Sequence, residues 1–391
     1  MTSSFLKDLR PEALAAPSSG IVEVFDYGRT RAGLLPLWVG EGDRATPDFI
    51  REAAVISLEQ GETFYTYQAG IPPLREAIAG YLSRLYAASV APERIFVTNG
   101  GMHALQIAVR LIAGAGDEVI VPTPAWPNFR GALAVAGATT REVAMRFGHD
   151  GWQLDLADLE AAITPGTRAF CINSPANPTG WTATRDELAA MLDLARRHGL
   201  WIIADEIYGQ FAFGAQRAPS FRDVMSDDDK VMFVQTFSKN WAMTGWRIGW
   251  LEAPAALSQT IINLIQYSSS GTPVFAQRAG IAALEGGDDF ITGQRNMART
   301  NRDVLMSAFS TEPGFRVAQP PGAFYLFFGV DGASDTRQLA FDLIDHANVG
   351  LAPGTAFGTG GDGFLRLCYL RKTADIVEAA KRIVAAVRNR H

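Results

Sequence analysis

Short apolar runs and longer amphipathic stretches alternate along most of the chain. Runs rich in β-branched and aromatic residues occur at 94–99, 117–124, 168–175, 201–207 and 231–238. Several are followed by helical patterns, and within 102–113 apolar side chains recur at every third or fourth position. Repeated strand and helix units require crossover connections. We therefore predict an α/β protein with a large, mostly parallel sheet covered by helices on both faces.

The pattern changes after about residue 285. A charged helical stretch, a strand-like PPGAFYLFF segment, a second helical stretch and the apolar run RLCYL precede a last helix expected from about residue 373. This order is typical of a smaller α+β domain, and a chain of 391 residues is long enough for two domains. We expect an N-terminal segment, 1–45, that joins the small domain, a large domain over 46–285 and a small C-terminal domain over 286–391.

Composition narrows the classes of partner. The net charge of −6 and pI of about 5.5 give no basic stripe, which argues against nucleic acid or an anionic membrane surface. Charges at Lys7, Asp8 and Arg10 interrupt the apolar run that a signal peptide would need, so we expect a cytoplasmic protein. Two cysteines, Cys171 and Cys368, lie in apolar runs and five histidines are scattered, so neither a disulfide framework nor a metal site is predicted.

Chemically informative residues follow several of the predicted strands. In open parallel sheets, ligands bind beyond the carboxyl ends of the strands. Here those positions hold Gly100 and Gly101 before a helix, Asn177 in a turn, and Asp205 followed by Tyr208. A glycine pair at a helix N-terminus can bind phosphate, and a buried Asp needs a cationic partner such as a protonated ring nitrogen. Taken singly, each also fits a turn, a helix cap or a core tyrosine.

Lys239 follows another predicted strand and lies among small hydroxyl residues. Thr236 precedes it and Arg247 comes eight positions later. A lysine that is partly desolvated near another cation has a lowered pKa, and its neutral amine can form a Schiff base with an aldehyde. Thr236, Arg247 and the amides of Gly100 and Gly101 can converge on the phosphate of that aldehyde. The sequence therefore predicts a site for a phosphorylated aldehyde cofactor.

These residues lie in blocks that resemble the fold-type I pyridoxal-phosphate enzymes, specifically the class I/II aminotransferases. The resemblance covers nearly the whole chain, and the combination of NPTG, DEIY and SK with GWRIG is highly specific. The matching blocks, in the order of the family, are GEGDRATPDF (40–49), YTYQAGIPPLREAIAGY (65–81), TNGGMHAL (98–105), SPANPTG (174–180), ADEIYG (204–209), SKNWAMTGWRIGW (238–250), PPGAFYLF (320–327) and LAPGTAFG (351–358).

The resemblance implies pyridoxal 5′-phosphate as cofactor and assigns catalytic roles. Lys239 resembles the lysine that holds the cofactor as a Schiff base and shuttles the substrate proton. Asp205 resembles the carboxylate that keeps the pyridine nitrogen protonated, so that the ring accepts electrons. Tyr208 and Asn177 match the residues that hydrogen-bond the phenolic oxygen of the ring, and Trp126 is similar to the aromatic residue that stacks on it.

Phosphate and substrate contacts follow from the same resemblance. Gly101, the amide of Met102, Thr236 and Arg247 resemble the phosphate cup, to which Gly100 also belongs. Tyr65 matches a tyrosine that reaches the phosphate of the neighbouring subunit, which implies a homodimer with shared sites. For the substrate, the resemblance implies a carboxylate-binding arginine at Arg366 and further contacts from Gly40, Trp126 and Asn177.

Two departures from the aspartate-specific relatives bear on the substrate. Those relatives place a second cation either directly after the glycine pair or some thirty residues beyond the Schiff-base lysine. Here the first position is Met102, and 248–277 contains neither Lys nor Arg. An unpaired carboxylate buried at that place costs several kcal/mol, so we expect a neutral or aromatic side chain to be preferred to aspartate. Arg29 or Arg31 could still supply the missing charge and make the protein an aspartate aminotransferase.

Two other functions stay open on the sequence. A carbon–sulfur β-lyase on the same scaffold would use the same lysine to expel a β-substituent of the substrate. A cofactor-binding regulator would resemble a fusion with a DNA-binding module, but about forty residues before GEGD leave no room for a winged helix and carry no basic patch. The resemblance to the class I/II aminotransferases makes transfer of an α-amino group between an amino acid and a 2-oxo acid, by a ping-pong mechanism, the expected reaction.

Overall fold

The computed structural model describes residues 4–14 and 16–389. Its large sheet has seven strands, and six of them run in the same direction. β10 is the antiparallel exception and lies between β2 and β9. In spatial order the strands are β2 (Ile95–Thr98), β10 (Gly249–Glu252), β9 (Val231–Thr236), β8 (Trp201–Asp205), β7 (Thr167–Asn173), β3 (Glu118–Thr123) and β4 (Thr139–Ala144).

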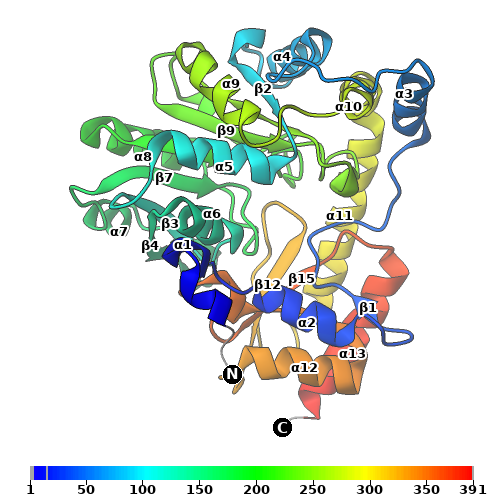
Figure 1. Cartoon of the computed structure of the whole chain (residues 1–391). Helices are drawn as coiled ribbons and strands as arrows, with labels where there is room; N and C mark the ends of the chain where they lie inside the picture. Colours follow the sequence, from blue (N-terminus) through cyan, green and yellow to red (C-terminus); the bar gives the residue numbers. More distant parts are fainter. Residues whose placement is uncertain (1–3, 15, 390–391) are drawn as a thin grey trace.

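Helices cover both faces of this sheet (Figure 1). Along β7, Ala169 and Cys171 join the apolar cluster under α5, whereas Phe170 and Ile172 join the cluster under α8. Alternating side chains of one strand therefore enter two separate cores, which explains the continuous apolar runs of the sequence. The helices of the large part of the chain are α3 (Asp48–Glu59), α4 (Pro72–Tyr86), α5 (Gly101–Ile112), α6 (Asn128–Ala136), α7 (Leu156–Ala161), α8 (Arg185–His198), α9 (Ser258–Gln266) and α10 (Val274–Gly286).

Local sequence signals explain where α8 begins and ends. Thr184 accepts a hydrogen bond from the Glu187 amide, and the Glu187 carboxylate accepts one from the Thr184 amide. This reciprocal cap satisfies amides that the first turn leaves without partners. Gly199, with φ +67°, ends the helix in the left-handed conformation.

A second, antiparallel sheet lies in the C-terminal part. Its strands, in spatial order, are β11 (Phe315–Arg316), β12 (Tyr325–Val330), β15 (Phe364–Cys368) and β14 (Ala352–Pro353). The long helix α11 (Asp288–Phe309) runs from the large part of the molecule into this smaller part, where it packs against α13 (Thr373–Arg388) (Figure 1). α12 (Thr336–Ala347) contacts both α13 and the N-terminal helix α2 (Gly20–Gly28).

Short elements complete the chain. β1 pairs in parallel with β13, which ties the N-terminal segment to the small sheet region. These elements are α1 (Pro11–Leu14), β1 (Leu35–Pro36), β13 (Val349–Gly350), the hairpin β5 (Arg146–Gly148) and β6 (Gly151–Gln153), and 3₁₀ turns at Ser4–Asp8, Pro92–Arg94, Phe221–Asp223, Thr244–Trp246, Ala255–Leu257 and Gly354–Phe357.

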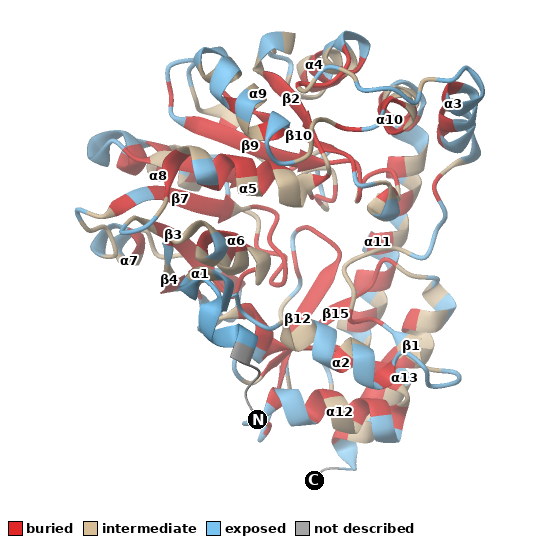
Figure 2. Cartoon of the chain, viewed as in Figure 1, coloured by how far each residue is buried: buried red, intermediate tan, exposed pale blue. Residues whose placement is uncertain are grey.

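The predicted fold class is confirmed. The large sheet is mostly parallel and helix-covered, and a smaller α+β region follows it. Most strands of both sheets are buried, the edge strands β4 and β11 are more exposed, and exposure concentrates on the outer helix faces and loops (Figure 2). No helix among the described residues is both long and apolar enough to cross a membrane. The division at residues 45 and 285 stays a proposal, supported by the contacts of α2 with α12 and by the two separate sheets.

Candidate active site

The carboxyl ends of the six codirectional strands meet at one edge of the large sheet. The strand pairing sets Asn173 directly beside Asp205 and places Thr98 and Thr236 on either side of Gly249. A cavity of about 550 Å³ opens at this edge, between the large sheet, the small sheet and the N-terminal segment. Its walls therefore come from segments far apart in the sequence, as ligand sites in open α/β sheets do.

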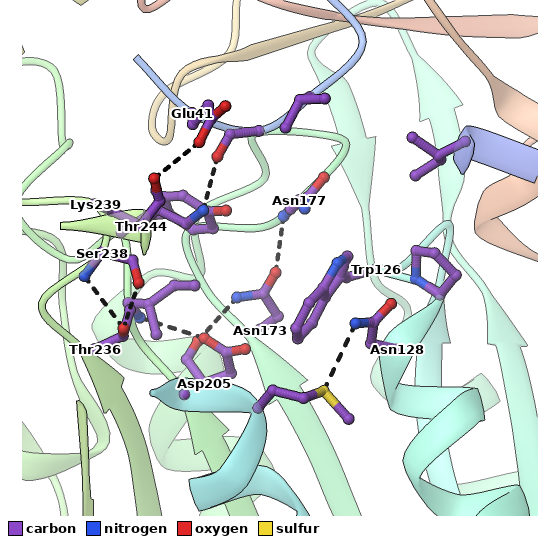
Figure 3. Close-up of a pocket in the computed structure, with 18 of the residues that line it drawn as sticks. Glu41, Trp126, Asn128, Asn173, Asn177, Asp205, Thr236, Ser238, Lys239 and Thr244 are labelled. Atoms are coloured by element: carbon purple, nitrogen blue, oxygen red, sulfur yellow. Dashed lines mark hydrogen bonds between the residues drawn. The ribbon is translucent and has the colours of Figure 1, made fainter. Parts of the chain in front are cut away.

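Asp205 lies at the end of β8 and lines this cavity (Figure 3). Its side chain is 2% exposed, and its carboxylate accepts one hydrogen bond at 3.3 Å, from the Ile207 amide. Burial raises the pKa of Asp205 to about 7, against the opposing effects of the Ile207 amide and the Lys239 charge. Within the described part of the chain Asp205 forms no ion pair, so a cationic group in the cavity would compensate its desolvation.

Lys239 follows β9 and is partly buried. Its Nζ donates a hydrogen bond of 2.7 Å to the Gly40 carbonyl and forms no ion pair within the described residues (Figure 3). Desolvation lowers the pKa of Lys239 to about 8, and the nearby Arg366 acts in the same direction. A substantial share of the amine is therefore neutral near pH 8 and can attack a carbonyl carbon.

An anion cradle lies where β2 and β9 end. Gly100 adopts φ +83°, and a Cβ atom there would lie 2.7 Å from Nη2 of Arg247. The glycine thus lets the guanidinium approach the N-terminus of α5, where backbone amides have no helical partner. Thr236 donates from Oγ1 to Ser238 at 2.9 Å, and both residues line the cavity. Hydroxyls, amides and a guanidinium together are the groups that bind phosphate.

Arg366 lies on β15 and reaches the cavity from the small sheet. It is 2% exposed, it donates to Oδ1 of Asn177 at 2.8 Å and to the Trp38 carbonyl, and its Nε has no hydrogen-bond partner within the described chain. Its guanidinium lies between the rings of Tyr325 and Phe357, at 4.8 and 5.0 Å from their centroids. Among the residues described, no carboxylate pairs with this buried charge, which makes it a site for an anionic ligand.

Two asparagines and an indole shape the remaining wall. Asn173 donates to the Asp205 carbonyl at 3.0 Å and accepts from the Asn177 amide at 2.8 Å, which fixes the turn that carries Asn177. Trp126 follows β3, is half-buried, and packs edge-on against Phe129 at 5.6 Å. Figure 3 shows its indole next to Asn173 in this view, and both residues line the cavity together with Asp205. A flat ring above Asp205 would find this indole as a neighbour.

Most of the predicted site residues lie around this one cavity. Eleven of them line it: Gly40, Gly101, Met102, Trp126, Asn177, Asp205, Tyr208, Thr236, Lys239, Arg247 and Arg366. Gly100 contacts Arg247 just behind the lining. Tyr65 is not among them: it is 96% exposed and lies beside a different hollow, between 62–66 and 269–275. In a single chain Tyr65 therefore makes no contact with the cradle, and the functional roles of all these residues remain proposals.

Other lining residues escaped the sequence analysis. Glu41 accepts from Thr244 Oγ1 at 2.8 Å, and Asn128 donates to the Met102 sulfur at 3.6 Å. Ile21, Val22 and Phe25 of α2 and Val39 add an apolar wall. Glu41 belongs to the GEGD block that matches the family, so this block could have identified Glu41 as a residue of the site. The wall from α2 could not be predicted, because only the packing of the N-terminal segment brings it to the cavity.

The two arginines that could have supplied a second cation point elsewhere. Arg31 pairs with Asp345, and Arg29 lies 3.5 Å from Asp26. Arg278 pairs with Glu62 at 2.6 Å. The cations among the described lining residues are Lys239, Arg247 and Arg366.

Comparison with known proteins agrees with this geometry. The family model of aminotransferase class I and II matches residues 33–383. The chain belongs to this family. A probable aspartate/prephenate aminotransferase of Aquifex aeolicus is 36% identical over 357 residues, which is 89% of each chain.

Solved aminotransferase structures are similar over nearly their whole length. A single mutant of the Thermus thermophilus aspartate aminotransferase has a TM-score of 0.90 at 32% identity, covering 97% of this chain and 99% of the other. The aromatic aminotransferase of Pyrococcus horikoshii has a TM-score of 0.87 at 29% identity, covering 95% and 99%. This aminotransferase therefore has the fold-type I architecture and is an enzyme of the transferase class.

Proposed function

We propose that this aminotransferase uses pyridoxal 5′-phosphate to move an α-amino group between an amino acid with a neutral or aromatic side chain and a 2-oxo acid, by a ping-pong mechanism. One observation carries the proposal: an amine with a lowered pKa, a buried carboxyl and a buried guanidinium without a counter-ion line the same cavity. They are Lys239, Asp205 and Arg366. Burial of a charged group without a partner of opposite charge is unfavourable, and a ligand of matching charges would compensate all three.

The residues present fit the cofactor. Asp205 provides the anion that a protonated pyridine nitrogen needs, and burial keeps water from screening it. The cradle of Gly100, Gly101, Thr236 and Arg247 suits the phosphate, and Lys239 suits the aldehyde. When bound, pyridoxal phosphate supplies an electron-accepting ring that stabilises negative charge at the substrate Cα.

The protein supplies the proton transfer and the orientation. Lys239 Nζ is the group that takes the proton from the substrate Cα and returns a proton to the carbon of the former aldehyde, because it is the amine that lines the cavity among the described residues. Asp205 keeps the proton on the ring nitrogen through its negative charge. The Gly40 carbonyl, 2.7 Å from Nζ, holds the amine inside the cavity.

Arg366 would bind the substrate α-carboxylate. Asn177 and the Trp38 carbonyl hold two of its nitrogens, and the neighbouring rings of Tyr325 and Phe357 restrict the orientation of the guanidinium. A restricted orientation favours two parallel hydrogen bonds to a carboxylate, which orient the Cα toward Lys239.

Three features of the cavity disfavour an acidic side chain. Met102 occupies the position after the glycine pair, and its sulfur accepts from Asn128. The apolar residues of α2 and Val39 form one wall. Glu41, which lines the same cavity, adds a negative charge that would repel a second carboxylate. A side chain such as that of leucine, methionine or phenylalanine would instead bury apolar surface against this wall.

Aspartate transfer is the second candidate. The names of the Aquifex and Thermus relatives favour it, whereas the lining of this cavity opposes it. A carbon–sulfur β-lyase is not favoured, because the matching proteins are named as aminotransferases.

We further propose that the active form is a homodimer in which Tyr65 of one subunit completes the phosphate cradle of the other. Arg247 is exposed in the single chain, so its side of the cradle is open. Large exposed aromatic side chains lie on the segments around 64–67 and 267, and such residues are enriched at protein interfaces. They are Phe64, Tyr65, Tyr67 and Tyr267.

A panel of amino acids tests the substrate class. The purified protein, loaded with pyridoxal phosphate, is mixed with single amino acids while the cofactor absorbance is recorded, and kcat/KM is then measured with 2-oxoglutarate or pyruvate as acceptor. We expect larger values for leucine, methionine or phenylalanine than for aspartate. A larger value for aspartate would support the second candidate. Pyruvate and ammonia formed from cystathionine without any 2-oxo acid would instead indicate the lyase.

A further inference from the structure

Tyr325 is a buried tyrosine whose hydroxyl has no role in the site described so far. It lies at the start of β12 and pairs with Cys368 of β15, while Phe327 pairs with Arg366. Positions two apart on neighbouring antiparallel strands share a face of the sheet, so Tyr325 and Arg366 are diagonal neighbours. Accordingly the Arg366 guanidinium lies 4.8 Å from the centroid of the Tyr325 ring. The ring is thus part of the carboxylate site.

The hydroxyl of Tyr325 contacts the large-sheet half of the molecule. It lies 2.7 Å from the hydroxyl of Tyr208, which follows β8 of the large sheet, and both rings are fully buried. The two rings meet edge-on, with centroids 5.5 Å apart. A Cβ atom built on Gly40 would lie 2.3 Å from this hydroxyl, so only glycine at position 40 leaves room for it. One phenol thus contacts residues of three separate segments that line the cavity.

Both hydroxyls keep their protons, because burial raises the pKa of Tyr325 and of Tyr208 above the usual value. Either hydroxyl can donate in the hydrogen bond between them. When Tyr325 donates and Tyr208 accepts, the proton of Tyr208 is free for an acceptor in the cavity that Tyr208 lines.

We propose that Tyr325 is a positioning residue: its hydroxyl donates to Tyr208 and turns the Tyr208 proton toward the phenolic oxygen of the cofactor, while its ring face holds the Arg366 guanidinium. This inference rests on the proposed function. Hydrogen bonds in a chain polarise one another, so the donation from Tyr325 makes Tyr208 a stronger donor. Tyr325 therefore acts on both sides of the junction between the two sheets: its ring contacts the Arg366 guanidinium, and its hydroxyl orients the hydrogen bond of Tyr208 to the cofactor ring.

Tyr325→Phe tests the hydroxyl and keeps the ring. A hydrogen bond to the phenolic oxygen withdraws electron density from it, so weakening that bond makes the nitrogen that links lysine and cofactor more basic. The pH midpoint of the cofactor absorbance change should rise by roughly 0.5 unit or more, and kcat should fall about threefold to tenfold. The KM for the amino acid should change less than twofold or so, because an aromatic ring still faces Arg366.

Tyr369→Phe is the matched control. Tyr369 is equally buried, and its hydroxyl donates to the Ala323 carbonyl at 3.4 Å, away from the cavity. The Tyr369→Phe variant should leave the pH midpoint of the cofactor absorbance change unchanged, even if its thermal stability falls. Shifts of equal size in both variants would mean that the effect is only structural and would overturn the inference.

A double-mutant cycle shows whether Tyr325 acts through Tyr208. Tyr325→Phe should shift the midpoint in the wild-type background and leave it unchanged in the Tyr208→Phe background. An equal shift in both backgrounds, or none in either, would refute the positioning role. Failure of the proposed function is recognised separately, because the wild-type protein would then bind no pyridoxal phosphate at all.

Discussion

Replacing Asp205 by Asn should stabilise the cofactor-free protein at neutral pH, although it removes a residue of the proposed active site. The substitution keeps the size of the side chain and an oxygen that can accept from the Ile207 amide. It removes a carboxylate that is 2% exposed and has no ion-pair partner among the described residues. The free energy of unfolding should therefore increase where the carboxylate of the wild type is charged.

The size of the effect follows from the pKa of Asp205. The pKa is raised from 3.8 to about 7, so the folded protein binds the proton more tightly than the unfolded chain. Below about pH 4 both states are protonated, and Asp then resembles Asn. As the pH rises from about 4 toward 7, Asp205 ionises in the unfolded chain but stays protonated in the folded protein. Ionisation lowers the free energy of the unfolded chain, so the free energy of unfolding of the wild type falls across this window. A shift of about three units corresponds to roughly 4 kcal/mol, which is an upper limit for the gain in the variant above pH 7.

Urea unfolding of the two cofactor-free proteins at pH 5 and pH 8 measures this difference. The variant should be more stable at pH 8, and the gap should shrink at pH 5. Asp229→Asn is the control of opposite sign: Asp229 is buried against Arg196 at 2.7 Å, and its pKa is lowered to about 2, so its loss should destabilise. The reasoning fails if Asp205→Asn destabilises at pH 8, or if its effect is the same at both pH values.

Three further outcomes follow from the same cavity. The rate at which the cofactor-free protein captures pyridoxal phosphate should rise with pH and level off above about 8, because Lys239 reacts as the neutral amine. Stopped-flow absorbance measures this rate. A rate that falls between pH 7 and 8.5 would contradict the lowered pKa of Lys239. Arg366→Lys should raise the KM for every amino acid about tenfold to a hundredfold, because the planar guanidinium that binds a carboxylate through two hydrogen bonds is lost. The affinity for the cofactor should stay within about twofold. An unchanged KM would show that Arg366 does not bind the carboxylate. Met102→Lys should raise the ratio of kcat/KM for aspartate to that for phenylalanine about tenfold or more, since a charged partner would then meet the side-chain carboxylate. Met225→Lys, which changes a residue outside the cavity lining, serves as its control, and a similar ratio in both variants would refute the account of substrate preference.

The sequence was sufficient to predict the fold, and most of the site residues predicted from it line the cavity. Alternation of apolar runs and helical patterns specifies a parallel sheet, and parallel strands carry the residues that follow them to one edge. That is why the sequence alone places Asp205, Lys239 and the glycine pair at 100 and 101 in one site. Arg366 was identified by resemblance, because its strand belongs to the other sheet.

The remaining parts of the site depend on contacts between distant segments. Nothing in the local pattern of α2 says that its apolar residues face the cavity, because the same amphipathic helix would pack equally well elsewhere on the small sheet. The bond between Tyr208 and Tyr325 joins residues 117 positions apart. Tyr65 shows the opposite limit: the family resemblance implies a contact with a neighbouring subunit, and a single chain leaves Tyr65 exposed.

The central claim is that Lys239 forms the covalent link to the cofactor, and peptide mapping tests it most directly. The protein is incubated with one equivalent of pyridoxal phosphate, reduced with sodium borohydride, digested and analysed by mass spectrometry. The chain contains five lysines, and Lys7, Lys230, Lys372 and Lys381 are not among the residues that line the cavity. We predict a pyridoxyl group on the peptide that contains Lys239 and loss of that label in Lys239→Ala. A label confined to the other lysines, or no label, would contradict the account.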